Sequence, residues 1–237
     1  MQITEMSGVE ELETLPIERD CKEKKVDKKT YTKFGIFIKR FVDICGASVG
    51  IIFLIPITFV LFVIKIFSKN KNEIFYSQSR IGKNGKEFKL YKYQTMIPGA
   101  DEELFKYLEK NSEAREEYKK YKKLKEDPRV TKIGKILRKT SLDEFPQFIN
   151  VLKGEMSLVG PRPYLLREKD DMGENYNKII TVKPGITGYW QVNGRSDVDF
   201  EERMQMELYY IENRNIAMDV KILFKTILKM FKKNGAI

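Results

Sequence analysis

The sequence predicts an α+β protein that is predominantly helical and attached to a membrane. Three observations lead to this fold class: a membrane-length apolar stretch, one strong β-hairpin signal, and several charged segments whose apolar residues recur with helical spacing. We expect three regions: a charged, flexible tail at 1–33, a re-entrant membrane helix-break-helix at 34–68, and a cytosolic domain with a small hairpin and amphipathic interfacial helices at 69–237.

The composition limits the chemistry that the chain can perform. Its 237 residues carry a net charge of +10, which favours an anionic partner: a membrane surface, a nucleic acid or a phosphorylated substrate. There is no histidine, which excludes Ser-His-Asp, Cys-His and His-based zinc sites. Reactions must then use carboxylates, lysine, tyrosine or serine, with an oxygen-liganded ion such as Mg²⁺ as the natural metal. Cys21 and Cys45 provide no disulfide framework, which fits a reducing compartment.

The membrane segment follows a tail that is acidic up to Asp20 and then rich in lysine. From Ile44 to Ile64 it holds 21 uncharged residues, about 31 Å as a straight helix, which matches a bilayer core. Both flanks are basic, with Lys33, Lys39 and Arg40 on one side and Lys65, Lys69 and Lys71 on the other. Because a spanning helix normally has one positive, cytoplasmic flank, this pattern favours a helix that enters the membrane, bends at Pro56 and returns. An ordinary spanning helix is an equal alternative, since membrane helices tolerate proline, and a buried core helix is disfavoured.

The domain begins with a hairpin and continues as helices. Two runs containing apolar residues flank Asn84-Gly85, which predicts a hairpin turn. Residues 101–126 are highly charged and lack Gly and Pro, which predicts an exposed helix or helix pair. Residues 131–139 form a short basic helix, and a further helix with apolar residues at 145, 148, 149 and 152 stops at Gly154.

The last helix, at 216–233, is amphipathic, with Lys221, Lys225 and Lys229 four residues apart. It is typical of an interfacial helix on anionic lipid. A helix that packs on the protein core with its lysines in water fits the same pattern equally well.

The carboxylate pair Asp143-Glu144 is the strongest candidate for chemistry. It follows a basic stretch that supplies Arg129 and Arg138, and arginines clamp phosphate oxygens while carboxylates bind Mg²⁺ or attack phosphorus. The competing interpretation is structural: Ser141 and Glu144 have capping-box spacing, and Asp143 is itself a suitable N-cap. Taken locally, the capping interpretation is the stronger one, and capping and catalysis are compatible.

Two polar loops present further side chains. Gly160-Pro161-Arg162-Pro163 is a rigid turn with one arginine, and the segment after Trp190 reads Gln191-Val192-Asn193-Gly194-Arg195. Each is also consistent with an ordinary connection. Neither matches a Walker A or dinucleotide-binding glycine pattern.

Several stretches, taken together in their order and spacing, resemble the bacterial sugar transferases of the monotopic phosphoglycosyl transferase superfamily. The resemblance extends from about Phe37 to the C-terminus, and the chain looks like the short form of the family, which consists of the catalytic core. The matching stretches begin at Arg80 (RIGKNG), Asp127 (DPRVTKIG), Leu137 (LRKTSLDEFPQ), Asn150 (NVLKGEMSLVGPRP), Lys183 (KPGITG) and Gln191 (QVNGR).

The resemblance implies transfer of a sugar-1-phosphate from a UDP-sugar to polyprenyl (undecaprenyl) phosphate with release of UMP, as the first membrane step of surface-glycan synthesis. Asp143 would be the nucleophile that forms a phosphosugar-aspartyl intermediate, Glu144 with Asp143 would hold Mg²⁺, and Pro56 would bend the re-entrant helix. The remaining residues at matching positions that would bind substrate or shape the site are Lys92, Arg129, Arg138, Arg162, Gln191, Asn193 and Arg195.

The chain departs from the family pattern at three positions. Gln94 replaces a usual arginine, Ile55 stands where serine often precedes the bend proline, and Glu207 replaces an aspartate. The sequence does not name the sugar, and it leaves a homodimer open.

We therefore expect an enzyme on the cytoplasmic face of the bacterial plasma membrane. One rival is a basic, membrane-bound adaptor without catalysis, in which the dyad only caps a helix. The other is nucleic-acid binding, which the absence of any recognised nucleic-acid motif disfavours.

Overall fold

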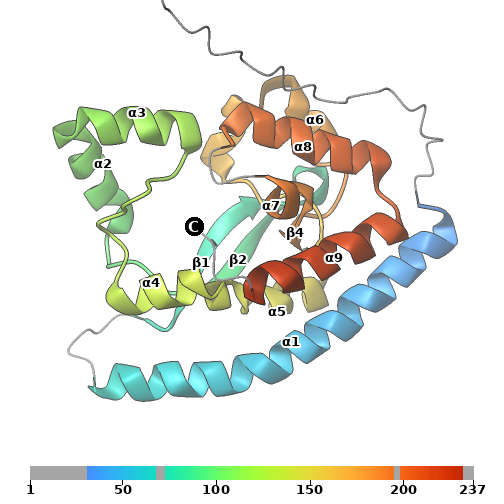
Figure 1. The fold of residues 1–237 in the computed structure, drawn as a ribbon, viewed down its shortest axis with the longest axis horizontal. Helices are drawn as coiled ribbons and strands as arrows, with labels where there is room; N and C mark the ends of the chain where they lie inside the picture. The colour runs from blue at the N-terminus through green and yellow to red at the C-terminus, as the bar shows by residue number, and fades with distance from the viewer. Residues whose placement is uncertain (1–30, 68–72, 195–197, 232–237) are drawn as a thin grey trace, which may run out of the picture.

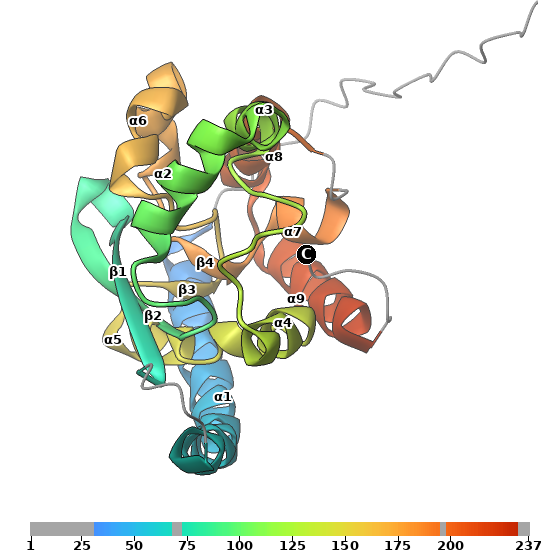
Figure 2. The same ribbon diagram turned by 90° about the vertical axis from the view of Figure 1, so that its left-hand side faces the viewer.

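The computed structural model describes residues 31–67, 73–194 and 198–231, and most of its elements are helices (Figure 1). The long helix α1 (Lys33–Phe67) runs along one side of the molecule. The strands lie in the interior, and α2 and α3 form an arm on the opposite side from α1 (Figure 2). The predominantly helical prediction is confirmed, whereas the tail at 1–30 lies outside the described residues.

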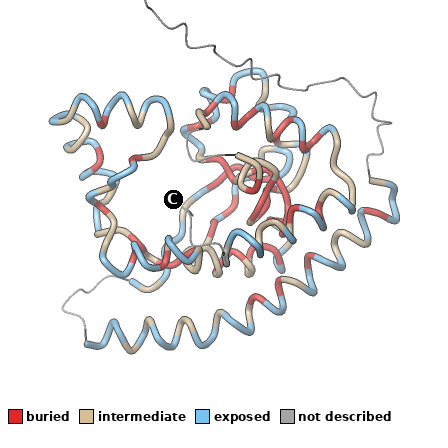
Figure 3. Tube along the Cα trace, in the orientation of Figure 1, coloured by how far each residue is buried: buried red, intermediate tan, exposed pale blue. Residues whose placement is uncertain are grey.

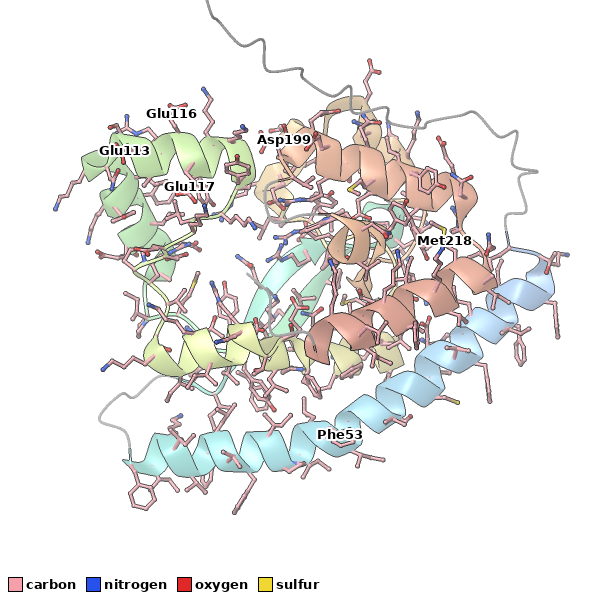
Figure 4. All side chains as sticks on the ribbon, viewed as in Figure 1. Phe53, Glu113, Glu116, Glu117, Asp199 and Met218 are labelled. Atoms are coloured by element: carbon pink, nitrogen blue, oxygen red, sulfur yellow. The ribbon has the colours of Figure 1, made fainter. Side chains whose placement is uncertain are left out.

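Within the described residues, α1 is the one helix long and apolar enough to cross a membrane, and 11 % of its apolar window is buried. It is one uninterrupted helix with Pro56 inside it, so the expected helix-break-helix is a bend within a single element. Figure 1 shows that α1 changes direction along its length, and Figure 4 marks Phe53 in this region. Proline has no N–H for the carbonyl of Ile52 and crowds it, which is a local cause for a bend. The re-entrant path through a bilayer stays a prediction.

Polar side chains attach the first half of α1 to the domain. Oδ1 of the buried Asp43 accepts hydrogen bonds from Oγ of Ser157 and from N of Leu158, both at 2.9 Å. Arg40 donates to the carbonyls of Val151 and Leu152 at 2.8 and 3.0 Å. These contacts hold α1 against α5 (Gln147–Lys153) and the strand that follows it.

The hairpin is confirmed. Strands β1 (Phe75–Ile81) and β2 (Glu87–Tyr93) pair antiparallel around a turn in which Asn84 and Gly85 have φ of 57° and 73°. Asparagine and glycine tolerate this left-handed conformation best. The pair therefore sets the register that places Lys92 near the end of β2.

The charged segment 101–126 contains the expected helix pair, α2 (Ala100–Lys110) and α3 (Ser112–Tyr121). A small apolar cluster of Leu104, Ala114 and Leu124 stabilises this arm. Figure 3 shows that the arm is largely exposed, whereas buried residues concentrate around the strands.

The basic segment forms α4 (Lys132–Lys139), in which Oγ1 of Thr131 accepts from N of Gly134 at 2.9 Å. The expected cap at Ser141 or Asp143 is wrong. Ser141 has φ of 55° and makes no capping bond, the short 3-10 turn η2 (Leu142–Glu144) follows, and α5 begins only at Gln147. The expected stop at Gly154 is confirmed, with φ of 79°.

A second sheet was not expected from the sequence. Strands β3 (Ser157–Val159) and β4 (Gly185–Thr187) pair in parallel. Each has three residues, too few for an alternating pattern. A Cβ atom at Gly185 would overlap the backbone of Gly160, so these glycines permit the close approach of the two strands.

The C-terminal part covers this second sheet. It consists of α6 (Tyr176–Ile179), α7 (Tyr189–Asn193), α8 (Phe200–Asn213) and α9 (Ile216–Phe231). The segment after Trp190, expected as a loop, is thus part of the short helix α7. On α9, Ile222 is buried and Phe224 is exposed.

Candidate active site

The acidic pair lies on η2, where the chain turns between α4 and α5. Asp143 is buried and Glu144 is half-buried. Strand β2 lies beside this turn and brings Lys92 to both carboxylates. Its Nζ atom is 2.8 Å from Oε1 of Glu144 and 4.0 Å from Oδ2 of Asp143. The structure thus brings Lys92, 52 positions before Glu144, into one charged group with the adjacent carboxylates Asp143 and Glu144.

The local sequence explains why the carboxylates face β2. Ser141 adopts a left-handed conformation, which ends α4 and redirects the chain, and Pro146 then precedes the first turn of α5. A left-handed non-glycine residue is strained, and such strain often occurs at functional sites. Gln147, buried in the first turn of α5, hydrogen-bonds the carboxylate of Glu144.

The two carboxylates differ electrostatically. Burial raises the pKa of Asp143, and the charge of Lys92 opposes this rise. Burial acts in the same direction on Glu144, but the charge and hydrogen bond of Lys92, together with Arg162 and Gln147, outweigh it and lower the pKa of Glu144. A buried carboxylate that is poorly solvated yet held beside cations is a suitable nucleophile toward phosphorus.

Arg138 is positioned on the Asp143 side of the site. Its Nε atom donates to Oγ1 of Thr95 at 3.1 Å, and its charge favours the ionised carboxylate of Asp143. Thr95 is buried and also accepts, through its carbonyl, from N of Thr131 at 3.0 Å. Sequence reasoning missed Thr95, for which there was no local signal.

Arg129 is directed elsewhere. Its guanidinium binds both carboxylate oxygens of Asp127, at 2.8 and 2.6 Å, and both residues precede α4. Burial by itself would raise the pKa of Asp127, but the hydrogen bonds and the charge of Arg129 lower it below its usual value. A substrate role for Arg129 stays a prediction, since this contact occupies its charge.

Arg162 lies on the Glu144 side. The turn from Gly160 to Pro163 fixes its main chain, whose N–H donates to Oε1 of Glu207 at 2.8 Å. Its charge helps to lower the pKa of Glu144, after the larger effects of burial and Lys92. Lys92, Arg138 and Arg162 thus place positive charge around the dyad.

The residues of α7 make contacts away from the dyad. Nε2 of Gln191 donates to the carbonyl of Ile186 at 3.1 Å, and Oδ1 of Asn193 accepts from Nζ of Lys225 at 2.6 Å. Arg195 lies outside the described residues. Substrate binding by these three positions stays a prediction.

The side chains of the site fit Mg²⁺ only if substrate phosphates supply part of its ligands. Among the described residues there is no group of three or more acidic, cysteine or histidine side chains that would hold a metal alone. Mg²⁺ is commonly bound by one or two carboxylates together with substrate phosphates, and Asp143 and Glu144 provide two. The residues present therefore suit an ion that binds together with a diphosphate.

Comparison with known proteins agrees with this site. The family model described as bacterial sugar transferase matches residues 34–233. An uncharacterized sugar transferase of Haemophilus influenzae is 44% identical over 199 residues, which are 84% of this chain and 42% of that protein. The exopolysaccharide production protein ExoY of Rhizobium meliloti is 39% identical over 202 residues, 85% of this chain and 89% of ExoY.

The undecaprenyl-phosphate galactose phosphotransferase of Salmonella typhimurium is 40% identical over 200 residues, 84% of this chain and 42% of that enzyme. The chain thus spans less than half the length of some curated relatives and most of the length of others. The matched region contains α1 from its second residue onward, the dyad and every described residue that surrounds the dyad. On this evidence, the chain belongs to the bacterial sugar transferase family.

Proposed function

We propose that this protein transfers a sugar-1-phosphate from a UDP-sugar to polyprenyl phosphate and releases UMP, at the start of surface-glycan synthesis. The observation that carries the proposal is the contact of Lys92 with both members of the Asp143-Glu144 pair. The names of relatives, among them an undecaprenyl-phosphate galactose phosphotransferase and a UDP-galactose-lipid carrier transferase, support the substrate classes.

The reaction that the site supports has two steps. A carboxylate oxygen of Asp143 attacks the β-phosphorus of the UDP-sugar, the bond from that phosphorus to the bridging oxygen breaks, and UMP leaves. A phosphate oxygen of polyprenyl phosphate then attacks the same phosphorus and restores the carboxylate. Two steps allow one site to receive a water-soluble and a lipid substrate in turn.

The surrounding cations have separate tasks in this scheme. Lys92 opposes the rise that burial causes in the pKa of Asp143, which favours the ionised nucleophile, and it orients Glu144. Arg138 and Arg162 stabilise charge that develops on the phosphoryl oxygens and on the departing UMP. Mg²⁺, held by Glu144 and Asp143 together with the donor phosphates, would neutralise the diphosphate.

The location of the site fits a lipid acceptor. α5 begins close after the dyad, and α1 packs along α5 with its apolar residues exposed. We propose that α1 attaches the enzyme to the cytoplasmic face of the bacterial plasma membrane, where UDP-sugars and the polyprenyl phosphate head group meet.

The test is a panel of UDP-sugars incubated with polyprenyl phosphate, Mg²⁺ and the full chain in membranes, with UMP as readout. We expect UMP from at least one donor, and we expect Asp143→Asn to lower its rate at least about a thousandfold while the protein stays in the membrane. A donor labelled in its β-phosphate should leave label on the wild-type protein when the acceptor is omitted. A wild-type protein that forms no UMP from any donor would instead favour the membrane adaptor.

A further inference from the structure

Buried polar atoms without a hydrogen-bond partner concentrate in one part of the described structure. Buried polar groups in folded proteins are normally paired, so each unpaired group calls for an explanation such as a bound ligand. The seven side chains with such an atom are Arg80, Arg162, Tyr164, Trp190, Gln191, Arg203 and Glu207. We call them the unpaired cluster.

Contacts show that the unpaired cluster is one region. Nη1 of Arg80 donates to the carbonyl of Pro163 at 3.0 Å, next to Arg162. The main chain of Arg162 donates to Glu207 at 2.8 Å, and Glu207 lies one helical turn after Arg203 on α8. The guanidinium of Arg203 lies over the ring of Trp190, 4.6 Å from its centroid. The cluster thus joins β1, the turn at Gly160–Pro163, α7 and α8.

The unpaired cluster contains three arginines, Arg80, Arg162 and Arg203, but only one carboxyl group, that of Glu207. Arg80 and Arg203 are 8% and 3% exposed, and within the described chain neither forms an ion pair with a carboxylate. Burial lowers the pKa of Arg80 to about 10 and raises the pKa of Glu207 to about 8. Buried guanidinium groups are destabilising unless an anion pairs with them, so this arrangement is suited to an anionic ligand.

The cluster continues into the catalytic site through Arg162. The charge of this arginine acts on Glu144 of the dyad and also on Arg203. A ligand whose phosphate lies at the dyad would therefore have the rest of its length directed toward Trp190 and Arg203.

We propose that the unpaired cluster is the binding site for the nucleoside monophosphate half of the donor, with Arg203 and Trp190 as its far wall. This inference rests on the proposed function for the identity of the donor. The guanidinium groups pair with the phosphate that departs in UMP. The unpaired oxygen of Gln191 accepts from a ribose hydroxyl or from the uracil N–H, and the carboxyl group of Glu207, mostly protonated at neutral pH, donates from its unpaired oxygen to an oxygen of the nucleotide. The planar Arg203–Trp190 pair provides a face for stacking.

The chain offers a direct probe, because Trp190 is its one tryptophan. The full-length protein in lipid nanodiscs is titrated with UMP without acceptor, and tryptophan fluorescence is excited at the red edge, where uracil does not absorb. We expect a saturable change with the wild type. Arg203→Lys, which keeps the charge and loses the planar group, should weaken UMP binding at least about tenfold. It should raise KM for the UDP-sugar by a similar factor and leave KM for polyprenyl phosphate unchanged.

A matched control is Arg167→Lys, an exposed arginine near the cluster, which should bind UMP like the wild type. If Arg203→Lys does not fold, Gln191→Met serves instead: it keeps the length of the side chain but removes the unpaired acceptor oxygen. The inference is overturned if UMP leaves the Trp190 signal unchanged, or if both cluster variants that fold bind UMP as tightly as the wild type. UMP binding that depends on Arg203, without transfer to lipid by the wild type, would support the cluster and refute the proposed function.

Discussion

The hydroxyl groups of Tyr93 and Thr58 lie 2.6 Å apart and join β2, the strand that carries Lys92, to α1 close to Pro56. Both also lie within hydrogen-bond distance of the carbonyl of Leu54, at 3.2 and 2.8 Å, so the three oxygens form one small network. Tyr93 is buried next to Lys92 on β2, and Thr58 follows Pro56 by two residues. A Thr hydroxyl bonded to the carbonyl four residues earlier bends a helix. This pair therefore gives α1 a second local cause for a bend, next to Pro56.

Tyr93→Phe should lower the free energy of unfolding by about 1 kcal/mol, because one hydroxyl and its hydrogen bonds are lost. In a Thr58→Val background the same change should have a smaller effect, since the partner is already absent. A double-mutant cycle of thermal unfolding in nanodiscs measures the coupling, expected at roughly 0.5 kcal/mol or more. Tyr76→Phe, an exposed tyrosine on β1, is the control. Strictly additive effects of the two substitutions would refute the link.

Lys92→Met should move the acid limb of the pH–rate profile to higher pH. Burial already raises the pKa of Asp143, and Lys92 is the largest opposing influence, so its removal raises this pKa further. The nucleophile must be ionised, so the rate falls as pH drops through that pKa, and the fall begins earlier in the variant. Lys89→Met, an exposed lysine on the same strand, is the control. An acid limb that stays where it is in Lys92→Met would show that Lys92 does not set the charge of Asp143.

Glu144→Gln should raise the Mg²⁺ concentration required for half-maximal activity at least about tenfold, since it removes one of two proposed carboxylate ligands. A chelator should abolish UMP formation by the wild type, and added Mg²⁺ should restore it. Glu87→Gln, exposed on β2, should keep the wild-type requirement. If Glu144→Gln loses activity but keeps the same Mg²⁺ dependence, Glu144 acts on Lys92 rather than on the metal.

The sequence predicted those turns and helix ends that depend on the backbone conformation of a few neighbouring residues. Asn84-Gly85 predicted the hairpin because only left-handed residues close that turn, and Gly154 predicted the end of α5 for the same reason. The expected cap failed because Glu144 is held by Lys92, 52 positions away, instead of by the backbone at Ser141. No spacing rule contains such a contact.

In the candidate site, too, residues that are neighbours in sequence were predicted and residues brought in by tertiary packing were not. The dyad was identified from residues adjacent in sequence, whereas Thr95, Gln147 and Arg203 were not, because each reaches the site through tertiary packing. Trp190 gave no clue either, since a single aromatic residue before a polar segment is consistent with many structures. Strand pairing and burial were needed to bring these side chains together.

A close contact between Gly50 and Phe148 seats α1 on the domain. Gly50 faces the ring of Phe148 on α5 so closely that a Cβ atom at Gly50 would overlap it. Glycine to alanine normally stabilises a helix by about 1 kcal/mol. Gly50→Ala should nevertheless destabilise this protein by roughly 1–3 kcal/mol, because the added methyl group overpacks a fixed contact.

Thermal unfolding of Gly50→Ala in nanodiscs measures this loss, and Ser48→Ala, exposed on the same helix, is the control. Phe148→Leu combined with Gly50→Ala should recover part of the stability, since the smaller side chain leaves room for the methyl group. The rate of UMP formation should follow stability in all three variants, because the bend, β2 and the dyad depend on how α1 is seated. A Gly50→Ala protein as stable and active as the wild type would show that the Gly50–Phe148 contact does not seat α1, and that its polar contacts, such as those of Asp43, Arg40 and Thr58, suffice.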